Sequence, residues 1–280
     1  MRNFLLGAAL AAALPLAAAP ASAQAVCDRN DLQGAVKSYL AAQTGGDPLK
    51  IPLADFTQIT EQGEIGSMST GILSTPIKID SARSLLDVQT CTTFTEVIAA
   101  NPAHPYVIGT RLQYAGRFNP IAAERINDLE FIVTDKGDWQ FDAAKTLGFA
   151  KAEDWTEIAT AARDSRAILT AAANAYLDHL NDVKVQVPWA TDCERLDGGR
   201  HSTAAASGGG CDAGLPSGVK VTERRYIVDE TLGAVAVLGL IGSDQSPSVH
   251  LFRIRQGKIR YVHAMAVCKS TPCALDSATH

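Results

Sequence analysis

Two histidines near the end of the chain, His250 and His263, have the spacing of a facing pair in a β-hairpin. If Gln256-Gly257 forms a two-residue turn, paired positions keep a constant sum, and His250 lies opposite His263. Phe252 and Tyr261 then continue the same face, and the Cβ atoms of the two histidines lie about 5 Å apart. Such a pair has the chemistry of a general acid and base, or of two metal ligands. The alternative is that both histidines are ordinary strand residues. A register shift of one residue would break their pairing.

Other residues have the chemistry to complete a site around this pair. Arg225 and Tyr226 lie on a β-rich run, where alternation places them on opposite faces. Arg225 is suited to hold a carboxylate or enolate oxygen with its guanidinium, and Tyr261 is suited to stabilise the same charge. For Arg225 and Glu194 the alternatives are ion pairing with neighbouring side chains and plain solvent exposure. The residues expected to contact a substrate are Trp189, Glu194, Tyr226 and Phe252.

The composition and the missing motifs exclude several classes of protein. The 280 residues carry 25 basic and 30 acidic side chains, for a net charge of −5, and no basic run is long enough to follow a phosphate backbone. The sequence also lacks a Gly-x-Ser-x-Gly elbow, a phosphate-binding loop, a dinucleotide fingerprint and a His-Glu-x-x-His helix. We therefore expect a small-molecule ligand, with no nucleic-acid partner, no cofactor and no resident metal.

The first 23 residues are typical of a secretory signal peptide. Met1-Arg2-Asn3 is a short positive start, Phe4 to Ala19 is rich in Leu and Ala, and Ala21-Ser22-Ala23 matches a cleavage site between small residues. No later segment reaches the length needed to span a membrane, since the longest candidate runs only from Gly233 to Gly242. We expect a periplasmic or extracellular protein without stable membrane insertion.

All six cysteines follow this segment, and an oxidising compartment favours disulfides between them. The sequence by itself does not choose among the possible pairings. We predict that Cys27 pairs with Cys91 within the first half, and that Cys193 pairs with Cys211 across a glycine-rich loop. Zinc binding is the competing interpretation, but the sequence has no C-x2-C pair.

The chain contains two copies of one unit, because segments of the first half recur in order in the second. The matching segments are 35–40 with 172–177, 51–54 with 187–190, 57–63 with 193–199, 93–99 with 223–229 and 129–141 with 249–261. Each copy begins with an amphipathic helix, which Asn30 or Asp28 opens and Gly45-Gly46 ends in the first, and which lies within residues 154–181 in the second. The predicted strands are 94–99, 106–114, 128–134, 223–228, 234–241, 249–255 and 258–267. This order predicts an α+β fold with helices packed on one face of an antiparallel sheet.

Several segments resemble a secreted family of unknown function found in fungi and proteobacteria. They include Asp164 to Ala167, Val185 to Trp189, Arg224 to Glu230, His250 to Ile254, Gly257 to His263 and Ala103 to Thr110. Each half in turn resembles the cone of the nuclear-transport-factor or SnoaL-like superfamily, a curved sheet wrapped around a pocket and backed by helices. The resemblance implies two tandem cone-shaped units over residues 24–150 and 151–280, as a monomer or homodimer.

Two functions are compatible with these features, because the superfamily holds both enzymes and plain binding modules. The first is a cofactor-independent lyase or isomerase acting on a small organic or sugar-derived molecule. In it His250 and His263 exchange protons with the substrate, and Arg225 or Tyr261 stabilises the developing charge. The alternative is a non-catalytic ligand-binding or interaction module that uses the same pocket.

Overall fold

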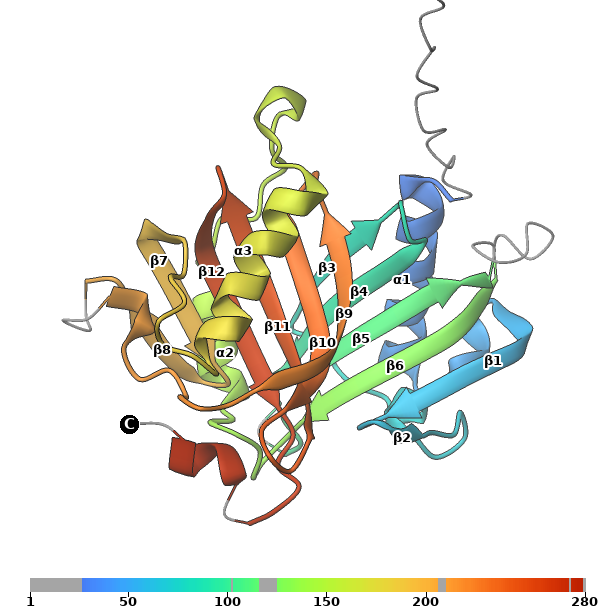
Figure 1. Ribbon diagram of the computed structural model, residues 1–280. Coiled ribbons are helices and arrows are strands. Elements are labelled where there is room, and N and C mark those ends of the chain that lie inside the picture. Colours follow the sequence, from blue (N-terminus) through green and yellow to red (C-terminus); the bar gives the residue numbers. More distant parts are fainter. Residues whose placement is uncertain (1–26, 102, 116–124, 206–209, 272, 279–280) are drawn as a thin grey trace, which may run out of the picture.

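The computed structural model describes residues 27–101, 103–115, 125–205, 210–271 and 273–278 (Figure 1). The predicted signal peptide, residues 1–23, lies outside this part of the chain. The described residues form an α+β structure with two similar units, each built on a six-stranded sheet and one main helix. Within the same residues, no helix combines the length and the apolarity needed to cross a membrane.

The two units contain the same elements in the same order. The first has helix α1 (Arg29–Gly45) and strands β1 (Leu53–Glu61), β2 (Glu64–Ile65), β3 (Ser81–Asp87), β4 (Thr92–Ala99), β5 (Tyr106–Tyr114) and β6 (Ile126–Thr134). The second has helix α3 (Arg166–His179) and strands β7 (Trp189–Asp197), β8 (Arg200–Thr203), β9 (Val221–Asp229), β10 (Ala234–Ile241), β11 (Ser246–Arg255) and β12 (Lys258–Ala266). Helix α2 (Ala143–Ala150) lies between them in the chain.

The strand order is also the same, β2-β1-β6-β5-β4-β3 in one sheet and β8-β7-β12-β11-β10-β9 in the other. In each sheet one pairing is parallel, β1 with β6 and β7 with β12, so the prediction of purely antiparallel sheets is wrong at this position. Both parallel pairs begin with the same contact. The carbonyl of Pro52 accepts from the Ile126 N–H at 2.8 Å, and the carbonyl of Pro188 accepts from the Ile259 N–H at 2.8 Å. The predicted match between these two segments is confirmed.

Two later alignments between the halves are wrong by one strand. Segment 93–99 lies in β4, whose counterpart is β10, and segment 129–141 begins in β6, whose counterpart is β12. The cause is β3, which contains no β-branched or aromatic residue and which the predicted strands therefore omit. The second predicted helix is also shorter than expected, because α3 begins only at Arg166.

Each sheet packs its main helix on one face and the other sheet on the opposite face. Tyr39 of α1 and Tyr176 of α3 are both buried between their helix and their sheet, on what we call the helix face. The opposite faces meet in a common core, which we call the shared face. Its residues include Phe94, Ile98, Val107 and Ile132 of the first sheet and Ile227, Leu238, Val249 and Leu251 of the second. Removal of these apolar surfaces from water is the main force that holds the two units together.

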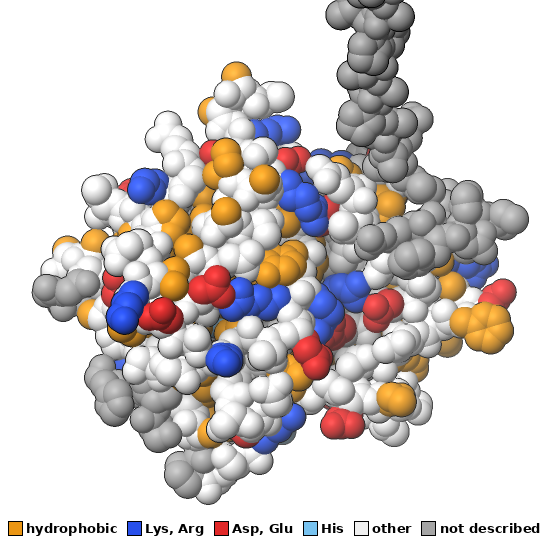
Figure 2. Space-filling model, in the orientation of Figure 1, with side chains coloured by type: hydrophobic (Ala, Val, Ile, Leu, Met, Phe, Trp, Pro, Cys, Tyr) orange, Lys and Arg blue, Asp and Glu red, His pale blue; other side chains and the backbone are white. Residues whose placement is uncertain are grey.

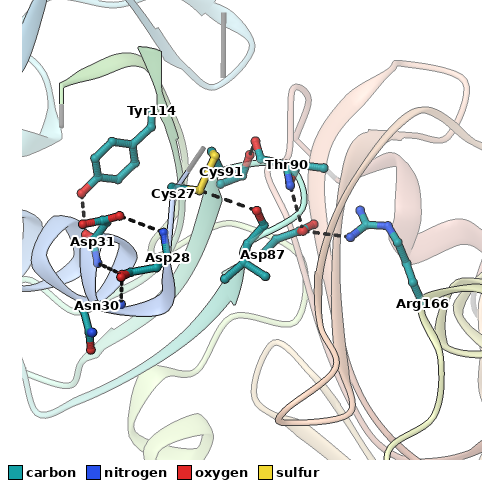
Figure 3. The surroundings of a disulfide bond; sticks show 11 residues. Cys27, Asp28, Asn30, Asp31, Asp87, Thr90, Cys91, Tyr114 and Arg166 are labelled. Atoms are coloured by element: carbon teal, nitrogen blue, oxygen red, sulfur yellow. Dashed lines mark hydrogen bonds and ion pairs between the residues drawn. A yellow bond between two sulfur atoms is a disulfide. The ribbon is translucent and has the colours of Figure 1, made fainter. Parts of the chain in front are cut away.

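Reciprocal ion pairs tie the start of each main helix to the other unit. Arg29 at the start of α1 binds Asp229 at 2.9 Å, and Arg166 at the start of α3 binds Asp87 at 2.8 Å. Each aspartate also accepts a hydrogen bond of 3.0 Å from a backbone N–H of the other unit. Figure 3 shows Arg166 and Asp87 beside the Cys27–Cys91 disulfide. These matched contacts relate the two units by an approximate twofold symmetry.

All six cysteines form disulfides. The predicted pairs Cys27–Cys91 and Cys193–Cys211 are confirmed, and the third pair is Cys268–Cys273. The first disulfide holds the start of α1 beside the turn between β3 and β4, next to the ion pairs described above. Three disulfides fit a protein that folds in an oxidising compartment and is secreted.

Candidate functional site

The hairpin of β11 and β12 places its two histidines on opposite faces of the sheet. The residues at the turn pair as predicted, but Arg260 is an extra residue that forms a bulge in β12. Beyond the bulge the pairing is shifted by one, so the partner of His250 is Ala264 instead of His263. Because side chains alternate along a strand, the shift turns His263 away from His250. The prediction of a facing histidine pair is therefore wrong.

His250 lies on the helix face and is only 2% exposed. Its ring centroid is 5.9 Å from that of Tyr176 and 6.4 Å from that of Phe252. Its Nδ1 has no hydrogen-bond partner among the described residues. Burial lowers the pKa of His250 to about 3, and the positive charge of Arg224 lowers it further in the same direction. The imidazole is therefore neutral near pH 7. Its pKa lies far below that pH, whereas an efficient general base has a pKa close to the pH at which it works.

Three of the predicted substrate contacts, Trp189, Tyr226 and Phe252, lie on the same helix face as His250. In the structure all three contact α3, and Trp189 Nε1 also donates to Asp212 Oδ1 at 2.5 Å. The ring of Tyr176 lies 5.7 Å from Trp189 and 5.2 Å from Phe252, and the Tyr226 hydroxyl donates to Asn174 Oδ1 at 2.7 Å. The sequence therefore identified residues that do come together, but here they form the packing between α3 and its sheet.

A buried ion pair on β7 was missed by the sequence analysis. Arg195 and Asp197 are fully buried, with Arg195 Nε 3.0 Å from Asp197 Oδ2. Arg195 also donates to the carbonyl oxygens of Cys211 and Ala213, at 3.0 and 2.9 Å, and so holds the loop that carries the second disulfide. Burial raises the pKa of Asp197 although two arginines act against it. The alternation of Cys193, Arg195 and Asp197 along the strand was the available signal.

His263 lies on the shared face, between two carboxylates. Its Nδ1 is 2.8 Å from Glu96 Oε1, and its Nε2 is 2.8 Å from Glu153 Oε1. Arg83 lies 3.3 Å from each of the same carboxylates. Burial alone would lower the pKa of His263, but Glu96 and Glu153 raise it to about 9. The carboxylates bind opposite sides of the ring, and in the described part of the chain no three His, Cys, Asp or Glu side chains are placed to hold a metal ion.

Strand β9 carries two ion pairs that point to different neighbours. Arg224 binds Asp178 of α3 at 2.7 Å, and Arg225 binds Glu130 of β6 in the other unit. Figure 2 shows basic and acidic side chains gathered across the middle of this face, where β9 passes between α3 and β6. Arg225 therefore pairs with a residue of the other unit, whereas the sequence suggested an ion pair with a residue close to it in the chain.

The last two predicted residues, Tyr261 and Glu194, lie apart from each other. The Tyr261 hydroxyl accepts from the Asp154 N–H at 3.3 Å beside the shared face, and Glu194 Oε2 lies 2.9 Å from Nε2 of His201 in the β7–β8 hairpin. The second sheet thus divides the predicted site. The helix face holds His250, Trp189, Tyr226 and Phe252, whereas His263, Arg225 and Tyr261 lie on the other side.

A cavity of about 460 Å³ opens at the end of the second unit, below the last turn of α3. We call it the end cavity. Two of the hydrophobic residues in its wall, Val219 and Leu275, belong to the core between α3 and the sheet. Its polar side chains come from three separate segments and are Asn181, Ser217, Lys220, Thr222, Ser243 and Gln245. Its volume is in the range of small-molecule sites.

Thr222, in the wall of the end cavity, directly precedes a bulge that the first unit lacks. In β9 the register shifts between Leu238 and Leu240, and Glu223 adopts a left-handed backbone with φ of 50°. The counterpart strand β3 pairs with β4 without any shift. Gly239 makes room for the bulge, since a Cβ there would lie 2.8 Å from the carbonyl oxygen of Thr222. A glycine inside the apolar run Ala234–Ile241 was the available sequence signal.

A second space, of about 510 Å³, lies between the two units. Its charged lining includes Arg29, Asp87, Arg166 and Asp229, the residues of the reciprocal ion pairs. These charges already form ion pairs with one another, so this cleft is part of the interface between the two units.

Comparison with known proteins gives one result for the second unit. No functionally curated protein matches the chain. Residues 162–266, which run from just before α3 to the end of β12, match the model of a domain of unknown function, DUF8021. The match includes most of the lining of the end cavity as well as His250 and His263. The second unit is therefore similar, over residues 162–266, to the DUF8021 domain.

Proposed function

We propose that the protein is a secreted module that binds a small polar molecule in the end cavity of its second unit. The observation that carries the proposal is the bulge of β9, where the second unit departs from the first directly after Thr222, a residue of the cavity wall. Bulges of this kind are frequent beside binding sites, where they redirect side chains. Hydroxyl and amide groups with one lysine line the space, and such groups suit a sugar-derived or other polyhydroxy molecule.

Acid/base catalysis by His250 and His263 has less support than binding. The two rings lie on opposite faces, one with its pKa lowered to about 3 and the other with its pKa raised to about 9. Neither value is near the pH at which a proton is exchanged efficiently in neutral solution. A lyase or isomerase activity would therefore need an acid and a base other than this pair.

The same proposal covers the architecture and the route of export. We take each unit, residues 24–150 and 151–280, to be a SnoaL-like cone, which the shared strand order and the single parallel pairing in each sheet support. We take residues 1–23 to be a signal peptide that sends the chain to the periplasm or outside, which the three disulfides support. A monomer is favoured, because the two shared faces cover each other.

The test is a binding screen of the purified protein against monosaccharides, sugar acids and polyols, by thermal shift and calorimetry. A ligand of the end cavity should raise the melting temperature in a saturable way. Thr222→Val and Lys220→Ala, which remove polar groups of the lining, should weaken its binding by about tenfold or more. Lys37→Ala, on an exposed position of α1 in the first unit, is the matched control.

Two results would contradict the proposal. The first is a ligand that binds the Thr222→Val and Lys220→Ala proteins as tightly as the wild type, because it would then lie elsewhere. The second is conversion of the ligand during incubation, detected by NMR, which also reveals a product of equal mass, because a pure binding module returns the ligand unchanged.

A further inference from the structure

Residues 151–158 run between the two sheets without helix or strand, and we call this segment the strap. Its Glu153 carboxylate is surrounded by three donors. His263 Nε2 lies at 2.8 Å, Arg83 Nη1 at 3.3 Å and Trp155 Nε1 at 2.7 Å. Two of these donors, His263 and Arg83, belong to the two sheets and not to the strap. The sheets therefore present a carboxylate-binding arrangement that a residue of the connecting segment fills.

The approximate symmetry shows that this arrangement is particular to one side of the molecule. Arg83 and Arg225 occupy equivalent positions, each four residues before the aspartate of a reciprocal ion pair. Opposite Arg225 stands Glu130, and the two bind each other directly. The position equivalent to Glu130 on β12 is His263, since both lie at the same register against their parallel partner strand. Arg83 therefore faces a second cation, His263, at the place where Arg225 faces the anion Glu130.

The two facing cations are neutralised by carboxylates without counterparts on the other side. Glu96 pairs with Arg83 across β3 and β4, at the position that Leu238 occupies against Arg225. Glu153 comes from the strap. The symmetric equivalent has one cation and one anion, Arg225 and Glu130, whereas this place has two cations and two anions. Only one of the anions, Glu153, is carried by a segment without regular structure.

A further cationic side chain under the strap has unused donors. Arg253 is fully buried, and its Nη2 donates to the carbonyl oxygen of Thr156 at 2.6 Å. Its Nε and Nη1 have no hydrogen-bond partner within the described residues. The guanidinium groups of Arg83 and Arg253 lie 4.2 and 5.7 Å from the centre of the Trp155 ring. Both therefore border the space that Glu153 and Trp155 fill.

We propose that Arg83, Arg253 and His263 form a binding site for a small free carboxylate, and that Glu153 occupies this site as an internal ligand. A free carboxylate binds by displacing Glu153, after which the strap opens. Guanidinium groups bind carboxylates through paired hydrogen bonds, and the unused donors of Arg253 favour a dicarboxylate over a monocarboxylate. The strap is held in part by such contacts, those of Glu153 with Arg83 and His263, and for these a free carboxylate competes.

The test compares four proteins, which are the wild type, Glu153→Ala, Glu153→Gln and Glu157→Ala. Glu157 is an exposed glutamate of the same strap and serves as the matched control. Each protein is titrated with acetate and with malonate up to roughly 50 mM, against chloride at equal ionic strength, by calorimetry and by NMR of the His263 ring. We expect Glu153→Ala to bind both carboxylates about tenfold more tightly than the wild type or Glu157→Ala, because the internal competitor is gone. Binding should shift the His263 Nε2 resonance.

Two results overturn the proposal. One is a folded Glu153→Ala protein that binds neither carboxylate in this range. The other is equal affinity in all four proteins, which places the carboxylate elsewhere. If Glu153→Ala fails to fold, Glu153→Gln keeps the shape of the side chain and removes its charge. It must then bind more tightly than Glu157→Ala, and its failure to do so also overturns the proposal.

Discussion

The surroundings of His250 indicate that protonation of its buried imidazole destabilises the folded protein. Replacing His250 with leucine tests this. The ring lies between Tyr176 and Phe252, and its Nδ1 has no partner among the described residues. Leucine has a similar volume, suits these neighbours and brings no polar atom to bury. The His250→Leu protein is therefore expected to fold and to lose only the pH dependence that belongs to His250.

The size of the effect follows from the pKa of His250, which falls from 6.5 to about 3 on folding. Because the folded value lies below the unfolded one, this group's contribution to stability is fully present above the unfolded pKa of 6.5. The contribution is lost as the pH falls toward 3, at about 1.4 kcal/mol per pH unit. Near pH 5 the wild type should have lost roughly 2 kcal/mol that the leucine variant keeps.

The assay is urea unfolding of both proteins between about pH 5 and pH 8, followed by circular dichroism. The stability difference, variant minus wild type, should grow by roughly 2 kcal/mol as the pH falls from about 7 to about 5. His104→Leu, which removes an exposed histidine of the first unit, controls for the loss of an imidazole as such. Parallel curves for the wild type and His250→Leu would refute the reasoning, because the ring would then titrate alike in the folded and unfolded chains.

Three further predictions concern other parts of the molecule. The pKa of His263 is raised to about 9, which gives stability that is present below the unfolded value of 6.5 and is lost as the pH rises through 9. The His263→Gln protein should therefore lose less stability than the wild type in urea unfolding as the pH rises above neutral. An equal loss in both proteins would contradict this prediction. Gly239→Ala places a Cβ 2.8 Å from a carbonyl oxygen of β9 and should cost about 1–3 kcal/mol in urea unfolding while weakening binding in the end cavity; wild-type stability and binding would count against the bulge. Asp87→Ala removes the partner of Arg166 and of the Val228 N–H and should cost about 2–4 kcal/mol, measured in the same way, whereas a loss below about 0.5 kcal/mol would show that the reciprocal pairs contribute little.

The sequence by itself determined the elements whose signals are local. Helix α1 was predicted from its apolar spacing, and Asp28 does cap it, accepting from the N–H groups of Asn30 and Asp31. The bounds of β5 and β10 agree with the prediction, because both strands are dense in β-branched and apolar residues. Strand β3 was missed for the opposite reason, since its sequence contains no residue of high β-propensity.

The tertiary structure decided which face each side chain occupies and which partner it meets. One extra residue, Arg260, reverses the face of His263, because side chains alternate with a period of two and nothing local in the hairpin marks the bulge. The carboxylates that bind His263 lie 167 and 110 residues before it in the chain. They reach it only when the shared faces of the two sheets pack, so no local pattern predicts them. The candidate residues were visible in the sequence, but packing between distant segments placed them in different surroundings.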